Sequence, residues 1–302
     1  MNTVPQTKSS VASANVFVLL LKQLRPKQWT KNLLIFAAPL FSITQISKME
    51  LSKSVIAFFL FSFISGCVYI LNDYVDREAD RLHPEKKHRP MASGALNPQF
   101  AIIFGVLLLS FSLVVGYMLN PLFALVLLVY FVLNVSYSLR LKHIVILDVM
   151  IIAAGFVLRA IAGGLSIDVP FTPWFLLCIL WLSLFLAISK RRHEVQLMQA
   201  KETKGTTRKV LHSYSVDLLN QLNTIVTTAT IICYAMFTSV SGHTHLMWTV
   251  PFVVYGIFRY LYLVHIENKG GTPEKVLLTD RHVLVTVVLY AVSTMTILSY
   301  FD

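Results

Sequence analysis

A dense group of acidic residues stands at the end of a long apolar stretch. Asn72, Asp76 and Asp80 are four positions apart, so on a helix their side chains share one face. Carboxylate and amide oxygens suit a hard cation such as Mg²⁺, which proteins usually hold with one or two carboxylates plus substrate phosphates. The spacing makes Asn72, Asp76 and Asp80 candidate metal ligands. A solvated, charge-rich helix end is the alternative interpretation.

Basic residues follow this acidic group directly, between His83 and Pro90. Lys86 and Lys87 would neutralise phosphate oxygens, and the planar guanidinium of Arg89 suits bidentate phosphate contacts. Acids that hold a metal beside bases that bind phosphates would form one metal-plus-phosphate site. The alternative for the three bases is the ordinary excess of positive charge in cytoplasmic loops.

The composition indicates where such a site must be built. Of 302 residues, 56% are hydrophobic and only 14% are charged, against ~45–50% apolar residues in soluble domains. This excludes a disordered chain. Cys67, Cys178 and Cys233 all lie in apolar runs, which excludes a disulfide scaffold. The histidines show no zinc-binding spacing. A multi-span membrane protein remains.

The apolar stretches predict an all-α integral membrane protein with nine transmembrane helices. They lie at 33–46, 52–72, 99–118, 121–139, 144–165, 171–189, 218–240, 246–264 and 282–300. Residues 1–22 form a polar and then amphipathic N-terminal segment, with no pattern typical of a cleaved signal peptide. Residues 23–302 are predicted to form one transmembrane domain.

The distribution of Lys and Arg predicts the orientation. Of the 26 such residues, 22 lie in residues 1–32, before the first predicted stretch, or in the connections at 73–98, 140–143, 190–217 and 265–281. Cytoplasmic loops retain positive charge, so this side is expected to be cytoplasmic, with the N-terminus inside and the C-terminus outside. The formal net charge of +11 therefore reflects topology, and nucleic acid is not expected as a partner.

Several motifs make the chain resemble a known family. The pattern Asn72-Asp-x-x-Asp76-x-x-x-Asp80, followed by His-Arg89-Pro90 and Gly94, resembles the first signature of the UbiA superfamily of intramembrane prenyltransferases. Within it, the chain is similar to the decaprenyl-phosphate phosphoribosyltransferase branch in four further segments: 25–32 (RPKQWTKN), 137–143 (YSLRLKH), 158–164 (LRAIAGG) and 279–281 (TDR). The resemblance extends from about residue 20 to residue 300.

This resemblance implies a fold and an activity. The expected fold is a nine-helix bundle with a cavity that faces the cytoplasm, is capped by loops and opens sideways to lipid. The expected reaction is Mg²⁺-dependent transfer of 5-phosphoribosyl from phosphoribosyl diphosphate to a polyprenyl phosphate in the bacterial cell (inner) membrane, for a cell-wall arabinose-donor lipid. The sequence leaves the oligomeric state open, a homo-oligomer included.

The resemblance also assigns roles. Asn72 and Asp76 match the family's first two motif positions and are the expected metal ligands, with Asp73 and Asp80 as second choices. Other residues are implied in substrate binding. Beyond the residues above, the resemblance implies Lys31, Tyr69, Tyr137, Lys142, Arg159, Lys190, Glu194, Asp280 and Arg281. Three of these residues also have a purely structural interpretation. Lys31 would anchor the chain at the membrane interface, Tyr69 would pack in the core, and Asp280 would cap a helix. A charge within a span is costly, so Arg159 is a functional candidate. Asp148 is about 16 Å away along the same helix, so Arg159 needs another partner, a lipid phosphate or an acid from a neighbouring span.

One departure from the wider superfamily bears on the substrate. Where prenyl-diphosphate users carry a second acidic motif, this chain has residues 189–194 (SKRRHE), with one acid among bases. Fewer carboxylates and more cations suit a phosphorylated sugar together with a phosphate-bearing lipid. Transfer of a prenyl group to an aromatic or quinone precursor remains the second interpretation. A transporter is less consistent, because the charges gather at one membrane face and no paired interrupted spans are seen.

Overall fold

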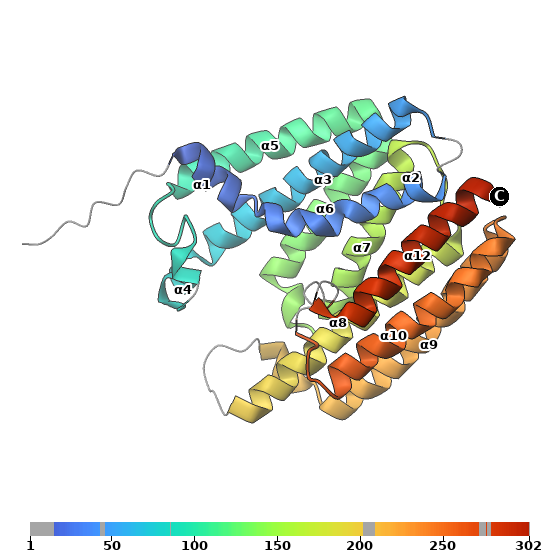
Figure 1. Cartoon of the computed structure of the whole chain (residues 1–302). Helices are drawn as coiled ribbons and strands as arrows, with labels where there is room; N and C mark the ends of the chain where they lie inside the picture. Colours follow the sequence, from blue (N-terminus) through green and yellow to red (C-terminus); the bar gives the residue numbers. More distant parts are fainter. Residues whose placement is uncertain are drawn as a thin grey trace, which may run out of the picture.

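A computed structural model describes residues 15–42, 46–84, 86–201, 209–271, 276 and 279–301 (Figure 1). Within these residues every regular element is a helix, α or 3₁₀ (η). The elements are α1 (Val16–Gln23), η1 (Pro26–Phe36), α2 (Ala37–Phe41), α3 (Lys48–Val75), α4 (Arg77–Leu82), η2 (Lys86–His88), α5 (Pro98–Leu119), α6 (Pro121–Leu139), η3 (Leu141–His143), α7 (Leu147–Ser166), α8 (Pro173–Lys201), η4 (Lys209–Ser213), α9 (Val216–Val240), η5 (Thr244–Thr249), α10 (Val250–His265) and α12 (Arg281–Tyr300).

Among the described residues, eight helical segments are long and apolar enough to cross a membrane. They are α3, α5, α6, α7, α8, α9, the continuous η5–α10 segment and α12. The all-α membrane fold is thereby confirmed, and these helices coincide with eight of the nine predicted stretches. The first predicted stretch, 33–46, falls on η1 and α2, and its residues 43–45 lie outside the described part of the chain.

The η1–α2 segment differs from the eight long apolar helices in its helix type. Its first eleven residues form a 3₁₀ helix and its last five an α-helix. A 3₁₀ helix rises ~2.0 Å per residue against ~1.5 Å for an α-helix, so the segment is about 30 Å long. That length matches the hydrocarbon core of a bilayer although the segment is shorter in sequence than a usual span.

Caps in the sequence account for where several helices begin. Asn97 and Asn120 each accept hydrogen bonds from the first turn of α5 and α6, and a proline follows each of them at the first helical position. Ser47 and Glu50 form a reciprocal capping box at the start of α3. Asn120 alone connects α5 to α6, so these two helices are neighbours and run antiparallel.

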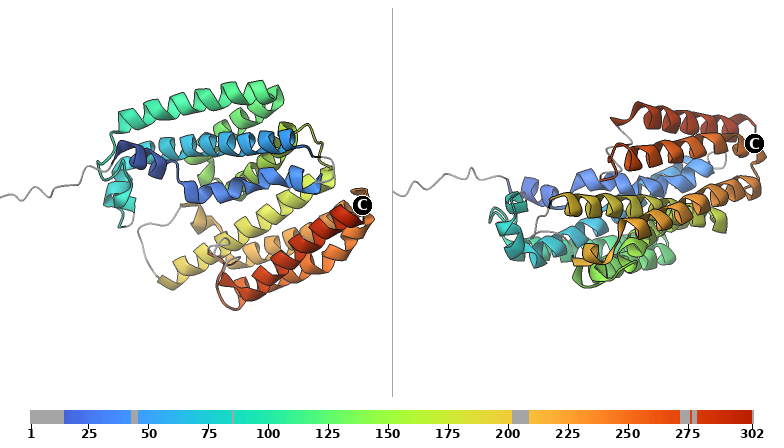
Figure 2. Two further views of the ribbon diagram at one scale, coloured as in Figure 1. Left: turned by 45° about the horizontal axis from the view of Figure 1, so that its top comes forward. Right: turned by 90° about the horizontal axis from the view of Figure 1, so that it is seen from below.

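The helices α3 and α7 lie at the centre of the bundle. In the most apolar part of each, 61% and 56% of residues are buried, against 17% in α5 and in α6, whose outer faces are left to lipid. One apolar cluster joins η1, α3, α6 and α7, and another joins α7 to α8, α9, α10 and α12. α4 and the C-terminal part of α8 lie at one end of the bundle, and the C-terminus lies at the other (Figure 2).

The end of the bundle that carries α4 is also the basic end. It collects the connections that hold most of the Lys and Arg residues of the described chain. Residues 1–14, 202–208 and 272–275, which include parts of the predicted basic connections, lie outside the described residues.

Candidate active site

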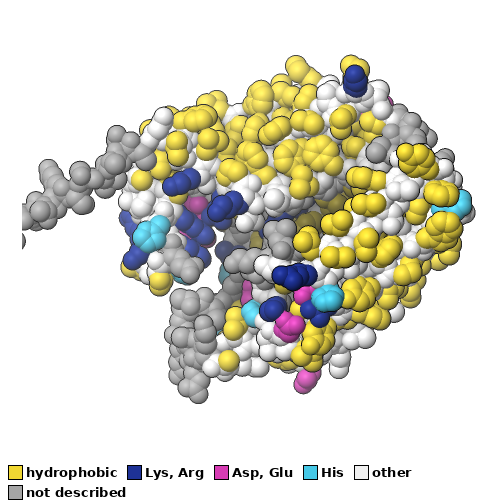
Figure 3. All heavy atoms as spheres, in the orientation of Figure 1, with side chains coloured by type: hydrophobic (Ala, Val, Ile, Leu, Met, Phe, Trp, Pro, Cys, Tyr) yellow, Lys and Arg dark blue, Asp and Glu magenta, His cyan; other side chains and the backbone are white. Residues whose placement is uncertain are grey.

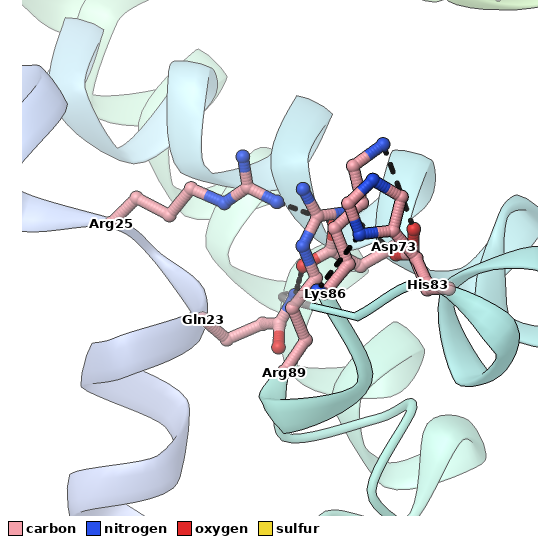
Figure 4. Close-up of polar contacts among 7 residues, drawn as sticks. Gln23, Arg25, Asp73, His83, Lys86 and Arg89 are labelled. Atoms are coloured by element: carbon pink, nitrogen blue, oxygen red, sulfur yellow. Dashed lines mark hydrogen bonds and ion pairs between the residues drawn. The ribbon is translucent and has the colours of Figure 1, made fainter. Parts of the chain in front are cut away.

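Asp73 is the centre of a charged cluster at the basic end of α3. Its side chain is 3% exposed. Its Oδ2 accepts a hydrogen bond from Nε2 of Gln23 at 2.6 Å, and its Oδ1 accepts from Arg25 at 2.5 Å and from Arg89 at 2.9 Å (Figure 4). Arg77, the nearest base along the chain, forms its ion pair with Glu78.

Asp80 shares Arg89 with Asp73. The NH1 group of Arg89 lies 2.6 Å from Oδ2 of Asp80, and Nζ of Lys86 lies 4.0 Å from its Oδ1. Asp80 is buried, whereas Lys86 is exposed. Two carboxylates thus face three cations, Arg25 included, so the Asp73 cluster carries an excess of positive charge that suits phosphate groups.

Asn72 and Asp76 are arranged differently from the two buried acids. α3 ends at Val75, but the backbone bonds from Asp76 N to Asn72 O and from Asp80 N to Asp76 O continue the helical register across the break. Asn72 and Asp76 are both half-buried. Among the described residues, no side chain bonds or pairs with the carboxylate of Asp76. Asp76 is therefore the acid of the motif that remains available to a ligand.

The donor set fits a divalent cation that is completed by a substrate. In the described part of the chain no three His, Cys, Asp or Glu side chains converge into a cluster that could hold a metal unaided. Mg²⁺ needs less from the protein when substrate phosphates supply oxygens. Asn72 and Asp76 would provide two ligands, while Asp80, the third predicted ligand, is occupied by Arg89.

Two other predicted residues lie near this cluster. The guanidinium of Arg25 stacks over the ring of Tyr69, 4.6 Å from its centroid, so Tyr69 orients an arginine that binds Asp73. Lys87 is exposed on η2. Gln23 and Arg25 were not predicted as site residues. Arg25 belongs to the family-like segment 25–32, which could have pointed to it. Its left-handed backbone (φ 51°) could not be predicted from the sequence.

A second charged cluster lies at the basic ends of α7 and α8, and sequence analysis missed its centre. Asp148, 0% exposed, accepts hydrogen bonds from Nε of Arg191 and from the hydroxyl of Tyr214, both at 2.6 Å. Arg191, 2% exposed, also binds Glu194. The prediction named Lys190 and Glu194 but not Arg191. Asp148 and Arg191 are ionisable residues near the ends of predicted spans, and this position could have identified them as candidates.

Tyr214 fixes the connection that leads into α7. Its hydroxyl accepts a hydrogen bond from the backbone N–H of Ile146 at 2.7 Å, where the backbone is left-handed (φ 70°). Burial and the hydrogen bond to Asp148 raise the pKa of the Tyr214 phenol.

Three residues predicted to bind substrate lie near this second cluster in sequence. Lys142, half-buried on η3, lies in the connection that leads into α7, and the half-buried Tyr137 lies near the end of α6. Lys190 is exposed on α8.

Asp280 and Arg281 stand at the start of α12. Asp280 caps the helix by accepting from the backbone N–H of Val283 at 2.9 Å, which confirms the structural alternative. Its carboxylate also accepts from Arg259 at 2.7 Å, and this holds the pKa of Asp280 at about 2. Arg281 is exposed and lines a groove between α10 and α12.

Arg159 lies away from both clusters, inside the bundle. It is 7% exposed and donates to the side-chain oxygen of Asn32, the carbonyl of Gly155 and the hydroxyl of Tyr130, at 2.7 to 2.8 Å. The partner that Arg159 needs is therefore a set of neutral oxygens, not an acid from a neighbouring span. The exclusion of Asp148 as its partner is confirmed, since Asp148 binds Arg191.

The surface view shows how the charges are distributed (Figure 3). One group of basic and acidic side chains gathers over α4 and η2, and another gathers at the start of α12. The face is hollowed between the two groups, and apolar side chains cover most of the rest. This distribution suits a membrane-embedded protein that handles charged substrates at one end.

The chain belongs to the UbiA prenyltransferase family, whose model matches residues 33–280. It is 36% identical to the decaprenyl-phosphate phosphoribosyltransferase of Mycolicibacterium smegmatis, over 87% of this chain and 86% of that protein. It is 35% identical to the protein of the same name from Corynebacterium glutamicum, over 87% and 81% of the two chains. A shorter match, 34% identity over 38% of this chain, is to the 4-hydroxybenzoate octaprenyltransferase of Shewanella denitrificans.

Solved structures confirm the fold. A UbiA homolog from Archaeoglobus fulgidus bound to DMAPP and Mg²⁺ superposes with a TM-score of 0.70 at 18% identity, over 93% of this chain and 99% of that one. A structure of digeranylgeranylglyceryl phosphate synthase superposes with a TM-score of 0.68 at 15% identity, over 93% of this chain and 98% of that one. This chain therefore has the UbiA fold.

Proposed function

We propose that this membrane enzyme transfers the 5-phosphoribosyl group of phosphoribosyl diphosphate to a polyprenyl phosphate and releases diphosphate. The observation that carries the proposal is the 35–36% identity, over most of the chain, to proteins named decaprenyl-phosphate phosphoribosyltransferase. The excess positive charge of the Asp73 cluster supports it, because a sugar diphosphate and a lipid phosphate together bring several negative charges to one site.

The Asp73 cluster is suited to bind the donor. Arg25 and Arg89 each use one nitrogen on Asp73 Oδ1, which leaves further N–H groups of each guanidinium for phosphate oxygens. Mg²⁺ bound by Asn72 and Asp76 would supply further neutralisation of the diphosphate. Lys31, Lys86 and Lys87 would add positive charge around it.

The reaction then needs positioning and charge neutralisation. The bond from C1 of the ribose to the diphosphate oxygen breaks with its electron pair on the diphosphate, and an oxygen of the lipid phosphate bonds to C1 from the opposite face. The lipid phosphate is already anionic at neutral pH, so no strong general base is required. Tyr137, Lys142, Lys190 and Arg281 are the proposed cationic or hydrogen-bonding groups on the acceptor side, and Glu194 holds Arg191 in place.

We place this site at the cytoplasmic face of a bacterial cell membrane, with the N-terminus in the cytoplasm. The gathering of Lys and Arg at the end of the bundle that carries both clusters supports this orientation. Polyprenyl phosphate would enter from the surrounding bilayer.

Transfer of a prenyl group from a prenyl diphosphate to an aromatic precursor is the second candidate, favoured by the shorter match to a 4-hydroxybenzoate octaprenyltransferase. The two are separated by giving the purified protein each labelled donor in parallel, with Mg²⁺ and the matching acceptor. We expect label in the organic phase from phosphoribosyl diphosphate with polyprenyl phosphate. Label only in a prenylated aromatic product would overturn the first proposal in favour of the second.

A further inference from the structure

The 3₁₀ helix η1 presents three distinct faces because side chains three positions apart eclipse one another in a 3₁₀ helix. Asn32, Ile35 and Ala38 continue one buried face into α2. Gln28, Lys31 and Leu34 form a second face that is half-buried throughout. A rotation by one residue would exchange these two faces, so whatever fixes Asn32 also fixes the direction of Lys31.

Asn32 is held from two sides. Its Nδ2 donates to the hydroxyl of Ser62 at 2.9 Å and to that of Ser65 at 3.5 Å, both on α3. Its Oδ1 accepts from Nε of Arg159 on α7 at 2.8 Å. All four side chains are less than 8% exposed. The side chain of Asn32 therefore links η1 to both central helices of the bundle.

Arg159 is itself held rigidly. Besides Asn32, it donates to Tyr130 on α6 and to the carbonyl of Gly155, and its guanidinium lies 4.9 to 5.5 Å from the ring centroids of Tyr130, Phe156 and Phe61. Three oxygens and three aromatic faces thus solvate the charge inside the span. These contacts satisfy the guanidinium without a phosphate.

From these contacts we infer that Arg159 is a positioning residue: through Asn32 it sets the rotation of η1 and so directs Lys31 at the diphosphate of the donor. The inference rests on the proposed function in its choice of donor. It replaces direct binding of substrate by Arg159, and it makes Arg159, Asn32 and Lys31 one functional unit.

The test is a set of double variants assayed with phosphoribosyl diphosphate as the varied substrate. Lys31→Ala, Asn32→Leu and Arg159→Met should each raise KM for this donor about 10-fold. Arg159→Met added to Lys31→Ala should raise KM no further, because the unit is already broken. Additive KM changes in that double variant would overturn the inference. Asn134→Leu, which removes an amide that donates to the carbonyl of Tyr130 on its own helix, is the matched control and should leave KM unchanged.

A second measurement does not depend on activity. In a Lys31→Cys protein, the rate at which the introduced thiol reacts with a water-soluble thiol reagent reports the direction of that face, with the parent protein as the background. Arg159→Met and the milder Ser62→Ala should change this rate at least about threefold, and Asn134→Leu should not. An unchanged rate in a folded Arg159→Met protein would contradict the inference. If the unaltered enzyme uses no phosphoribosyl diphosphate, the proposed function fails, and the thiol rate still decides the positioning role.

Discussion

Asp148 and Arg191 form a buried ion pair that joins α7 to α8, with Nε of Arg191 2.6 Å from Oδ2 of Asp148. Tyr214 and Glu194 complete the cluster by binding Asp148 and Arg191, respectively. The family's second acidic motif is expected at this end of α8, and here an internal cation stands there instead. The ion pair between Arg191 and Asp148 therefore links α8 to α7 through two protein side chains.

Removing one partner of this pair should be costly. Arg191→Met leaves the carboxylate of Asp148 buried without its cation, so we expect a loss of about 3–5 kcal/mol in the free energy of unfolding. Asp148→Leu combined with Arg191→Met should recover much of that loss. Thermal unfolding in detergent measures both variants. Lys269→Met, which breaks an exposed pair with Glu267, is the control and should change little; an equal effect there would contradict the prediction.

Asp76 and Asp73 should respond differently to the same change. Asp76→Asn removes a carboxylate that no described side chain engages, so turnover should fall ~10²-fold or more while thermal stability is kept. Asp73→Asn removes the shared partner of Arg25 and Arg89 and should lower thermal stability. Near-normal turnover in folded Asp76→Asn protein would show that Asp76 is not a metal ligand.

The long membrane-spanning helices could be predicted from the sequence. Apolar runs of about 20 residues leave helices as the ordinary way to span a bilayer, so α3, α5–α9, α10 and α12 could be predicted. The 3₁₀ form of residues 26–36 could not be predicted. The apolar run there is shorter than a usual span, and only the longer rise per residue of a 3₁₀ helix gives the segment a comparable length.

The candidate site was predicted as a region but not as a set of contacts. The i, i+4 spacing of Asn72 and Asp76 survives in the structure because backbone hydrogen bonds continue through Asp76. Spacing along one segment could not show that Asp73 binds Arg25, or that Asp148 binds Arg191, since these partners lie 48 and 43 positions apart. Such pairs are set by how the helices pack.

A glycine on α7 should be required for η1 to pack. A Cβ atom on Gly163 would overlap the backbone carbonyl of Ile35, which cannot move as a side chain can. Gly163→Ala should therefore lower the free energy of unfolding by about 1–3 kcal/mol. Gly256→Ala is the matched control, because a Cβ there would meet only Thr286 at 3.6 Å. Equal thermal unfolding of the two variants would show that the close approach is unimportant.

The pH dependence of Asp280 follows from its pKa. Hydrogen bonds from Arg259 lower the pKa from 3.8 to about 2. A folded-state pKa below the unfolded value means that the pair stabilises the protein above about pH 4 and loses this contribution as the pH falls toward 2. Thermal stability of the unaltered protein should therefore drop more steeply over that interval than that of Asp280→Asn. Between about pH 6 and 8 the difference in stability between the two proteins should stay constant; a change there would contradict the assigned pKa.

The most direct test of the proposed reaction follows two labels from one donor. Phosphoribosyl diphosphate carrying ¹⁴C in the ribose and ³²P in the diphosphate is incubated with the purified protein, Mg²⁺ and a polyprenyl phosphate. We predict that ¹⁴C enters the lipid phase, that ³²P stays in the aqueous phase as diphosphate, and that EDTA abolishes the transfer until Mg²⁺ is restored. Both labels in the lipid, or no ¹⁴C transfer from folded protein to any of several polyprenyl phosphates, would contradict the proposed function.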